Sequence, residues 1–130
     1  MVIDTSAVIA ILLSEPERDM FIRLIQSSST RLISAATLLE ASMVIDSRKG
    51  EPGRIDLDLF IRDAALEVMA VTQQQAEIAP VAFRRFGKGR PPAQLNFGDC
   101  FSYAAAKATG EPLLFKGSEF SKTDLLTVPI

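Results

Sequence analysis

Short apolar runs alternate with helical patterns along the whole chain, and this alternation restricts the fold more than any other feature of the sequence. Four runs have the character of buried strands, and a fifth lies near the C-terminus: residues 2–4, 31–34, 66–71, 113–115 and 125–128. Strands that are connected by helices pair in parallel and are covered on both faces. The sequence therefore predicts an α/β/α sandwich with a four- to five-stranded, mainly parallel sheet.

Helix caps and breakers mark the segments between these runs. Thr72 with Gln75 three residues later forms a capping box, and Asn96 caps a later helix that stops at Gly110. Pro80 lies inside one helical pattern and is expected to kink or weaken it. The predicted helices span residues 7–13, 16–27, 35–49, 54–65, 73–86 and 97–108.

The size and composition favour a small globular protein. At 130 residues the chain is long enough for one core and too short for two, so we expect a single domain over residues 1–130. Its apolar run at residues 7–13 is far below the ~20 residues that cross a bilayer, and no signal peptide or membrane partner is expected. Cys100, the only cysteine, cannot form an internal disulfide, which is typical of a cytoplasmic protein.

The absence of histidine removes most side-chain catalysis. Neither a histidine base nor a Cys-His or Ser-His pair is available, and a zinc site of imidazoles and thiolates is excluded. Three carboxylates instead lie within apolar runs, where soluble proteins rarely place charge: Asp4, Glu40 and Asp99. Hard oxygen ligands from distant segments suit Mg²⁺ or Mn²⁺.

These acids are expected to meet at one edge of the sheet. Asp4 ends the first strand, Glu40 lies in the first turns of the helix after the second strand, and Asp99 follows the Asn96 cap. Residues 116–119 follow the fourth strand at the same edge, where open parallel sheets bind their ligands. Like charges brought so close together need a cation.

Each acid taken alone also has a purely structural interpretation. Asp99 could complement a helix dipole, and Asp4 could cap the helix that follows it. Glu40 could be a core carboxylate paired with an arginine. Thr5 and Ser6 are better caps than nucleophiles, because no base is present to activate them. Only the joint placement of the three acids favours a metal site.

A basic segment precedes the Asp99 block. Arg84, Arg85, Lys88 and Arg90 place four positive charges within seven residues, interleaved with Phe86. The segment is either a solvated loop or a flap that contacts phosphates, in which Phe86 stacks on an unpaired base. Nucleic-acid cleavage needs such a division between a metal at the scissile phosphate and cations along the flanking backbone. The net charge of −2 gives no overall attraction to nucleic acid, so the attraction would be local.

Four blocks of the sequence together resemble the PIN-domain ribonucleases, in particular the VapC-like toxins of bacterial type II toxin–antitoxin modules. They are residues 1–7 (MVIDTSA), 39–40 (LE), 95–104 (LNFGDCFSYA) and 113–120 (LLFKGSEF). The first three look like the blocks that carry the family's three acids, and the last looks like its following strand and turn. The resemblance covers essentially the whole chain and implies a PIN-like α/β/α sandwich.

The resemblance implies a Mg²⁺- or Mn²⁺-dependent endoribonuclease, usually a homodimer, which a cognate antitoxin silences by filling the acidic groove. Asp4, Glu40 and Asp99 carry over as the metal-binding and catalytic triad, with Thr5 or Ser6 hydrogen-bonded to a carboxylate in support. Many members of the family have a fourth acid in the turn after the last strand, where this chain has Gly117. Glu119 or a water molecule is expected to replace that acid, and we expect one firmly bound cation.

Other functions remain compatible with the sequence. A catalytically idle module could bind an antitoxin or nucleic acid through the same groove, and a deoxyribonuclease could use the same acids because no residue visibly reads a 2′-hydroxyl. A receiver-type signalling domain needs an acid after the third strand, where this chain has Thr72 and Gln73. Residues 125–128 or the apolar early helices could form the dimer face.

Overall fold

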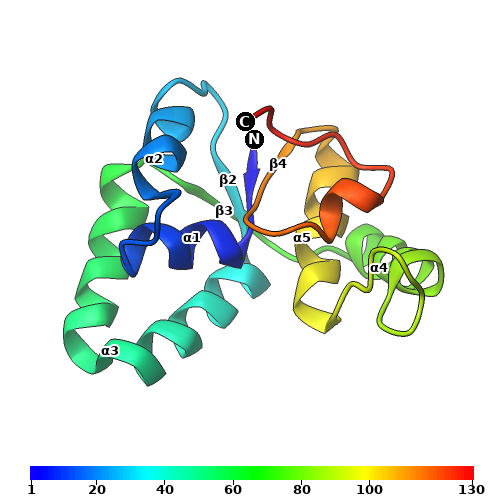
Figure 1. Cartoon of the computed structure of the whole chain (residues 1–130), viewed down its shortest axis with the longest axis horizontal. Coiled ribbons are helices and arrows are strands. Elements are labelled where there is room, and N and C mark those ends of the chain that lie inside the picture. Colours follow the sequence, from blue (N-terminus) through cyan, green and yellow to red (C-terminus); the bar gives the residue numbers. More distant parts are fainter.

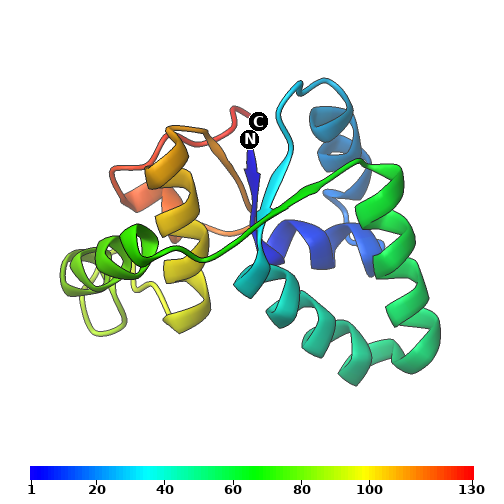
Figure 2. The same ribbon diagram turned by 180° about the vertical axis from the view of Figure 1, so that it is seen from behind.

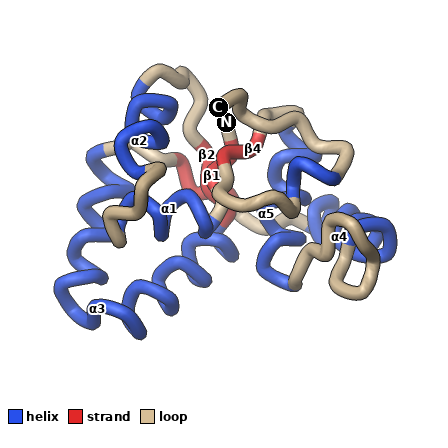
Figure 3. The backbone as a smooth tube through the Cα atoms, in the orientation of Figure 1, coloured by secondary structure: helices blue, strands red, loops and turns tan.

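The computed structural model describes residues 1–130 and has a four-stranded parallel sheet at its centre. The strands lie in the order β3-β2-β1-β4: Glu67–Met69, Leu32–Ser34, Val2–Ile3 and Leu113–Leu114. All three pairings are parallel, with Val2 opposite both Leu32 and Leu113. The predicted parallel α/β sheet is confirmed (Figure 3).

Helices cover both faces of this sheet, as the alternation predicted. The helices α1 (Thr5–Leu12), α2 (Arg18–Gln26) and α3 (Ala35–Asp63) lie on one side, and α4 (Gln73–Phe86) and α5 (Phe97–Thr109) lie on the other (Figure 1). The connection after β3 crosses from the α3 side to the α4 side (Figure 2). None of these helices combines the length and the apolar character needed to cross a membrane.

The fifth strand forms only in part. Residues 125–128 run parallel to β4, but the pairing is an isolated bridge between Leu113 and Thr127. Leu113 N–H donates to the Leu126 carbonyl, and Val128 N–H donates to the Leu113 carbonyl, both at 3.0 Å. Since β4 has only two residues, it has too few backbone groups to pair with a longer strand.

The helix α3 joins two segments that were predicted as separate helices. Its 29 residues bend at Gly50, whose φ of 60° and ψ of −144° leave the helical region. The prediction that the first helix ends at Gly50 is therefore correct. The predicted break up to residue 53 is wrong, because the chain resumes the helix at once. Gly53 packs so closely that an added Cβ would lie 2.6 Å from the Ile45 side chain.

The predicted caps at Asn96 and Gly110 are present, whereas the predicted Thr72–Gln75 capping box is only half formed, because the Gln75 side chain donates to the Ala70 carbonyl. The Thr72 hydroxyl accepts a hydrogen bond from Gln75 N–H, and Gly110 ends α5 in the left-handed conformation.

The helix α4 continues through Pro80, which was predicted to kink or weaken it. Pro80 has no N–H, so the carbonyl one turn before it lacks its usual helical donor. Because Pro80 is exposed, water can donate to that carbonyl instead.

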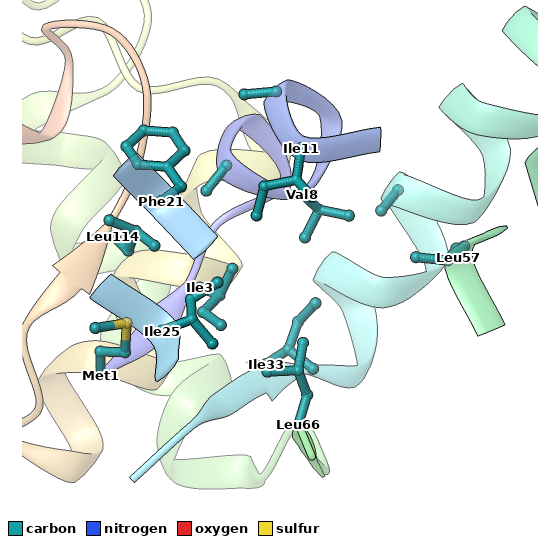
Figure 4. Close-up of a cluster of buried hydrophobic side chains, with 13 residues drawn as sticks. Met1, Ile3, Val8, Ile11, Phe21, Ile25, Ile33, Leu57, Leu66 and Leu114 are labelled. Atoms are coloured by element: carbon teal, nitrogen blue, oxygen red, sulfur yellow. The ribbon is translucent and has the colours of Figure 1, made fainter. Parts of the chain in front are cut away.

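Two apolar clusters hold the helices against the sheet. On the first face, Ile3, Ile33 and Leu114 of the sheet pack with side chains such as Val8 of α1 and Phe21 of α2 (Figure 4). Burial of each such side chain stabilises the fold by roughly 1.5–3 kcal/mol. The second cluster lies beneath α4 and α5. Both clusters anchor strands whose carboxyl ends point to the same edge.

Candidate active site

The four predicted acids gather at the carboxyl edge of the sheet. Asp4 directly follows β1, Glu40 lies in the second turn of α3, Asp99 is in the first turn of α5, and Glu119 follows β4. They are close enough for their charges to act on one another. Burial raises the pKa of Asp99 to about 6, against the opposing hydrogen bond from Asn96 N–H, and the charges of Asp4, Glu119 and Glu40 raise it further.

Asp4 is buried, with 4% of its surface exposed, and both of its oxygens accept hydrogen bonds. Oδ2 accepts from Ser6 N–H at 3.0 Å and from the Ser6 hydroxyl at 2.7 Å, while Oδ1 accepts from the Ser102 hydroxyl at 2.5 Å. The Ser6 oxygen in turn accepts from Lys116 N–H at 2.9 Å, which ties the end of β1 to the end of β4. Asp4 thus caps α1, as its structural interpretation predicted, and is also held rigidly at the edge.

Ser102 is a site residue that the sequence analysis missed. Its side chain is fully buried, donates to Asp4, and lies 3.2 Å from the Thr37 hydroxyl. One signal was present in the sequence: Ser102 comes three residues after Asp99 and therefore lies on the same face of the helix. A buried hydroxyl on that face needs a polar partner.

Glu40 is half-buried, and its Oε1 accepts a hydrogen bond from the Thr5 hydroxyl at 2.5 Å. No arginine pairs with it, so the alternative of a core carboxylate with a cationic partner is wrong. Its carboxylate lies directly against the backbone of Gly98, in the space that a side chain there would occupy. Gly98 therefore lets the start of α5 approach the start of α3.

Substitution Gly98→Ala is expected to separate activity from stability. The new methyl group would overlap the Glu40 carboxylate, and the flexible glutamate would move rather than the backbone. Alanine also favours a helix by up to about 1 kcal/mol relative to glycine. We therefore expect an unchanged or higher melting temperature, together with a loss of about 10-fold or more of the nuclease activity that the resemblance implies. Gly110→Ala, at a distant left-handed position, should instead lower stability and leave the activity of the folded protein unchanged.

Asp99 and Asn96 cap α5 reciprocally. Asp99 Oδ2 accepts from Asn96 N–H at 2.9 Å, and Asn96 Oδ1 accepts from Asp99 N–H at 2.8 Å. The structural interpretation of Asp99 as an acid at a helix N-terminus is therefore correct. It does not account for the whole side chain, because Oδ1 accepts no hydrogen bond from the protein and remains available to a ligand.

Glu119 occupies the space beside Gly117. The φ of 115° at Gly117 is a conformation that side-chain-bearing residues rarely adopt, and Glu119 Oε2 lies 2.5 Å from where a Cβ would stand. The carboxylate of Glu119 therefore takes up room that an acid at position 117 would use.

No lysine or arginine neutralises these four acids. Lys116, which follows β4, is paired instead with Glu15 at 2.9 Å and Glu17 at 3.2 Å, and its hydrogen bonds to Glu15 and then Glu17 raise its pKa. As placed in this structure, no three of the acids surround a single point closely enough to hold an ion. Hard, uncompensated oxygen donors fit a divalent cation.

The basic segment lies beside the first turn of α5, at the same end of the molecule as the start of α3 (Figure 1). Arg84, Lys88 and Arg90 are exposed and have no acidic partner, whereas Arg85 pairs with Asp124 at 3.6 Å. Arg85 also lies 4.6 Å from the centroid of the Phe86 ring.

The structure disfavours the stacking of a base on Phe86, one of the two interpretations of this segment. Its ring is half-buried, 6.1 Å from the Tyr103 ring on one side and covered by Arg85 on another. Tyr103 is fixed in turn by a 2.5 Å hydrogen bond to Asp124, and burial, followed by that bond, raises its pKa.

Comparisons with known proteins by family profile, by sequence and by structure agree with one another. The PIN-domain family profile matches residues 1–126. "Ribonuclease VapC30" of Mycobacterium tuberculosis is 49% identical over 130 residues, which is 100% of this chain and 99% of the relative. Among solved structures, Mycobacterium tuberculosis VapC20, described as a sarcin-ricin loop cleaving toxin, aligns with a TM-score of 0.77, 21% identity and coverage of 98% and 97%. VapBC2 of Rickettsia felis, bound to a promoter DNA fragment, aligns with a TM-score of 0.73, 20% identity and coverage of 97% and 94%.

Proposed function

Since this chain belongs to the PIN-domain family, we propose that it is an endoribonuclease of the VapC type, the toxin of a toxin–antitoxin pair that a cognate antitoxin silences. The proposal takes its reaction from the full-length relative named a ribonuclease. It takes its site from the acids at the carboxyl edge of the sheet. We also propose that residues 1–130 form a single domain and that the protein acts as a homodimer.

One observation carries the proposal. Four carboxylates from four separate segments meet at one edge with no cationic side chain among them, and their mutual repulsion contributes to the raised pKa of Asp99. Such an arrangement costs stability unless a ligand compensates it. Helix capping accounts for Asp4 and Asp99 one at a time, whereas the gathering of all four acids fits the binding of a cation.

Asp4, Asp99 and Glu40 would hold one Mg²⁺ or Mn²⁺ ion, with Glu119 close by. Bound there, the ion would supply Lewis-acid activation of the scissile phosphate and of the attacking water. The chain itself fixes the geometry: Ser6 and Ser102 orient Asp4, and Thr5 orients Glu40. 

The exposed cations of the basic segment complete the substrate site. Arg84, Lys88 and Arg90 are free to contact the phosphates on either side of the cut. Arg85, predicted for the same role, would first have to leave Asp124.

Cleavage of a mixed single-stranded RNA pool by purified, antitoxin-free protein tests this function. Mg²⁺ and Mn²⁺ reactions would run beside an EDTA reaction and beside a single-stranded DNA pool of the same sequences. Metal-dependent cutting of RNA is expected. Binding of RNA without cutting under any metal would indicate the catalytically idle module, and equal cutting of DNA would indicate a general nuclease.

The binding of metal is expected to weaken as the pH falls through about 6. Asp99 must lose its proton before both of its oxygens can serve a cation, and its pKa in the metal-free protein is about 6. The apparent affinity for Mn²⁺ should therefore be nearly constant above pH ~7 and fall by up to about tenfold per pH unit below 6. Titration with Mn²⁺ at a series of pH values measures this, and a flat profile from pH ~5 to ~7.5 would contradict it.

A further inference from the structure

A pair of buried hydroxyl groups joins the helix that carries Glu40 to the helix that carries Asp99. The side-chain oxygens of Thr37 on α3 and Ser102 on α5 lie 3.2 Å apart, and both residues are almost fully buried. Ser102 also donates to Oδ1 of Asp4, whereas the Thr37 hydroxyl has no hydrogen-bond partner other than Ser102. Valine has nearly the same shape as threonine and would need no polar partner there, so the hydroxyl itself requires an explanation.

The direction of these hydrogen bonds follows from the chemistry of Asp4. As a metal ligand, Asp4 is ionised and can only accept, so the single proton of the Ser102 hydroxyl is committed to its carboxylate at 2.5 Å. The Ser102 oxygen then has only acceptor capacity left, and Thr37 must be the donor at 3.2 Å. The hydrogen bonds therefore run from Thr37 to Ser102 to Asp4. Donation to the Ser102 oxygen strengthens the donation that Ser102 makes to the carboxylate.

The hydroxyl pair lies one helical turn from each of the other two acids. Thr37 comes three residues before Glu40 on α3, and Ser102 comes three residues after Asp99 on α5, so each shares a helix face with an acid. The starts of the two helices lie side by side (Figure 1). Glu40 makes a second contact between them, against the backbone of Gly98. With two contacts one turn apart, neither helix can slide along the other without breaking one of them.

Packing of the core does not account for the pair. If Thr37 were valine and Ser102 were alanine, the helices would still meet through apolar groups, and the atom left without its donor would be Oδ1 of Asp4. The cap of α1 does not need that atom, because Asp4 accepts from Ser6 N–H through Oδ2. The hydroxyl pair thus serves the orientation of one carboxylate oxygen at the edge of the sheet.

We propose that Thr37 is a positioning residue of the cleavage site, which acts on Asp4 through Ser102. Its hydroxyl holds the Ser102 hydroxyl in the orientation that donates to Asp4, and the same contact keeps the acid-bearing turns of α3 and α5 in register. Thr37 is too deeply buried to touch the ion or the RNA itself. The inference rests on the proposed metal-dependent function and extends it to a residue that supports the metal ligands from behind.

Titration with Mn²⁺ and chemical denaturation of the same variants test this role. Thr37→Val keeps the shape of the side chain and removes its hydroxyl, and it should weaken Mn²⁺ binding by about 2- to 10-fold, the factor for one net hydrogen bond. Thr37→Ser keeps a donor and should bind Mn²⁺ as the parent does. In a Ser102→Ala protein, the further substitution Thr37→Val should not change the Mn²⁺ affinity, because the chain of hydrogen bonds is already broken.

Thr109→Val is the matched control. The Thr109 hydroxyl donates to the Ala105 and Ala106 carbonyls at the other end of α5, so its loss should lower stability and leave the Mn²⁺ affinity unchanged. The proposal is overturned if Thr37→Val binds Mn²⁺ as tightly as the parent does, if Thr37→Ser binds it as weakly as Thr37→Val, or if the effects of Thr37→Val and Ser102→Ala add. It is also overturned if Thr37→Val does not fold, because the hydroxyl would then serve the fold and not the metal site.

Cutting of RNA by the parent is measured separately, which distinguishes this inference from the proposed function. A parent that binds Mn²⁺ and responds to Thr37→Val as expected, but cuts no RNA, would refute the ribonuclease and leave the role of Thr37 standing. A parent that cuts RNA, with a Thr37→Val variant that binds Mn²⁺ normally, would refute only the role of Thr37.

Discussion

Asp99→Asn is expected to abolish metal-dependent cleavage and, at the same time, to stabilise the metal-free protein at neutral pH. Activity should fall by at least about 100-fold, since the loss of groups that merely orient a metal ligand already costs 10- to 100-fold. The fold should survive, because an asparagine oxygen can still accept the hydrogen bond from Asn96 N–H that closes the cap of α5.

The sign of the stability change follows from the pKa of Asp99. The pKa of Asp99 is raised in the folded protein from 3.8 to about 6, so folding favours the protonated carboxyl group. The stability that the protonated form contributes is lost as the pH rises from about 4 through 6. At pH ~3.5, below both pKa values, the variant and the parent should therefore melt at similar temperatures in EDTA. At pH ~7.5 the variant should melt higher, because it lacks the uncompensated charge.

Addition of Mg²⁺ at pH ~7.5 should reverse the order, since only the parent gains from binding the ion. Melting curves at the two pH values, with EDTA and with Mg²⁺, measure both effects. Asp58→Asn is the control, because Asp58 is an exposed acid of α3 without an ionic partner, and it should show neither effect. An Asp99→Asn protein that is less stable than the parent at neutral pH in EDTA would show that Asp99 is foremost a structural cap.

Ser102→Ala is expected to have the second-largest effect on activity. The substitution leaves Oδ1 of Asp4 buried without its hydrogen-bond donor, which costs about 1–3 kcal/mol of stability. It also frees the carboxylate to rotate, so the affinity for Mn²⁺ and the rate of cleavage should fall by about 10- to 100-fold. 

Metal titration and chemical denaturation of the same variant separate the two consequences. Ser42→Ala is a matched control, because Ser42 donates only to a carbonyl of its own helix, and it should change neither quantity by much. If Ser102→Ala lowers stability but binds Mn²⁺ as tightly as the parent does, then Ser102 supports the core and does not position Asp4.

The parts of the fold and site that the sequence predicted depend on local information. Parallel pairing followed from the alternation of strands and helices, and the caps at Thr72 and Asn96 are contacts within four residues. Asp4 and Asp99 could be placed because each sits at the end of a strand or the start of a helix, and every such end in a parallel sheet meets one edge. 

The parts that the sequence did not predict depend on contacts between distant segments. Ser102 meets Asp4 across 98 residues, and no spacing within a helix reveals that pairing. The same holds for Arg85, whose partner Asp124 lies in the C-terminal segment. The exposure of Phe97 and the burial of Phe86 likewise follow from how α4 packs on α5. 

Titration of the metal-free protein with Mn²⁺ at pH ~7.5 tests the central claim most directly, with bound and free ion distinguished by electron paramagnetic resonance. The acids at the edge of the sheet are predicted to bind one ion per chain firmly, and Asp99→Asn is predicted to lose that binding while Asp58→Asn keeps it. Undiminished Mn²⁺ binding by Asp99→Asn, or no binding by the folded parent, would contradict the assignment of these carboxylates as a metal centre.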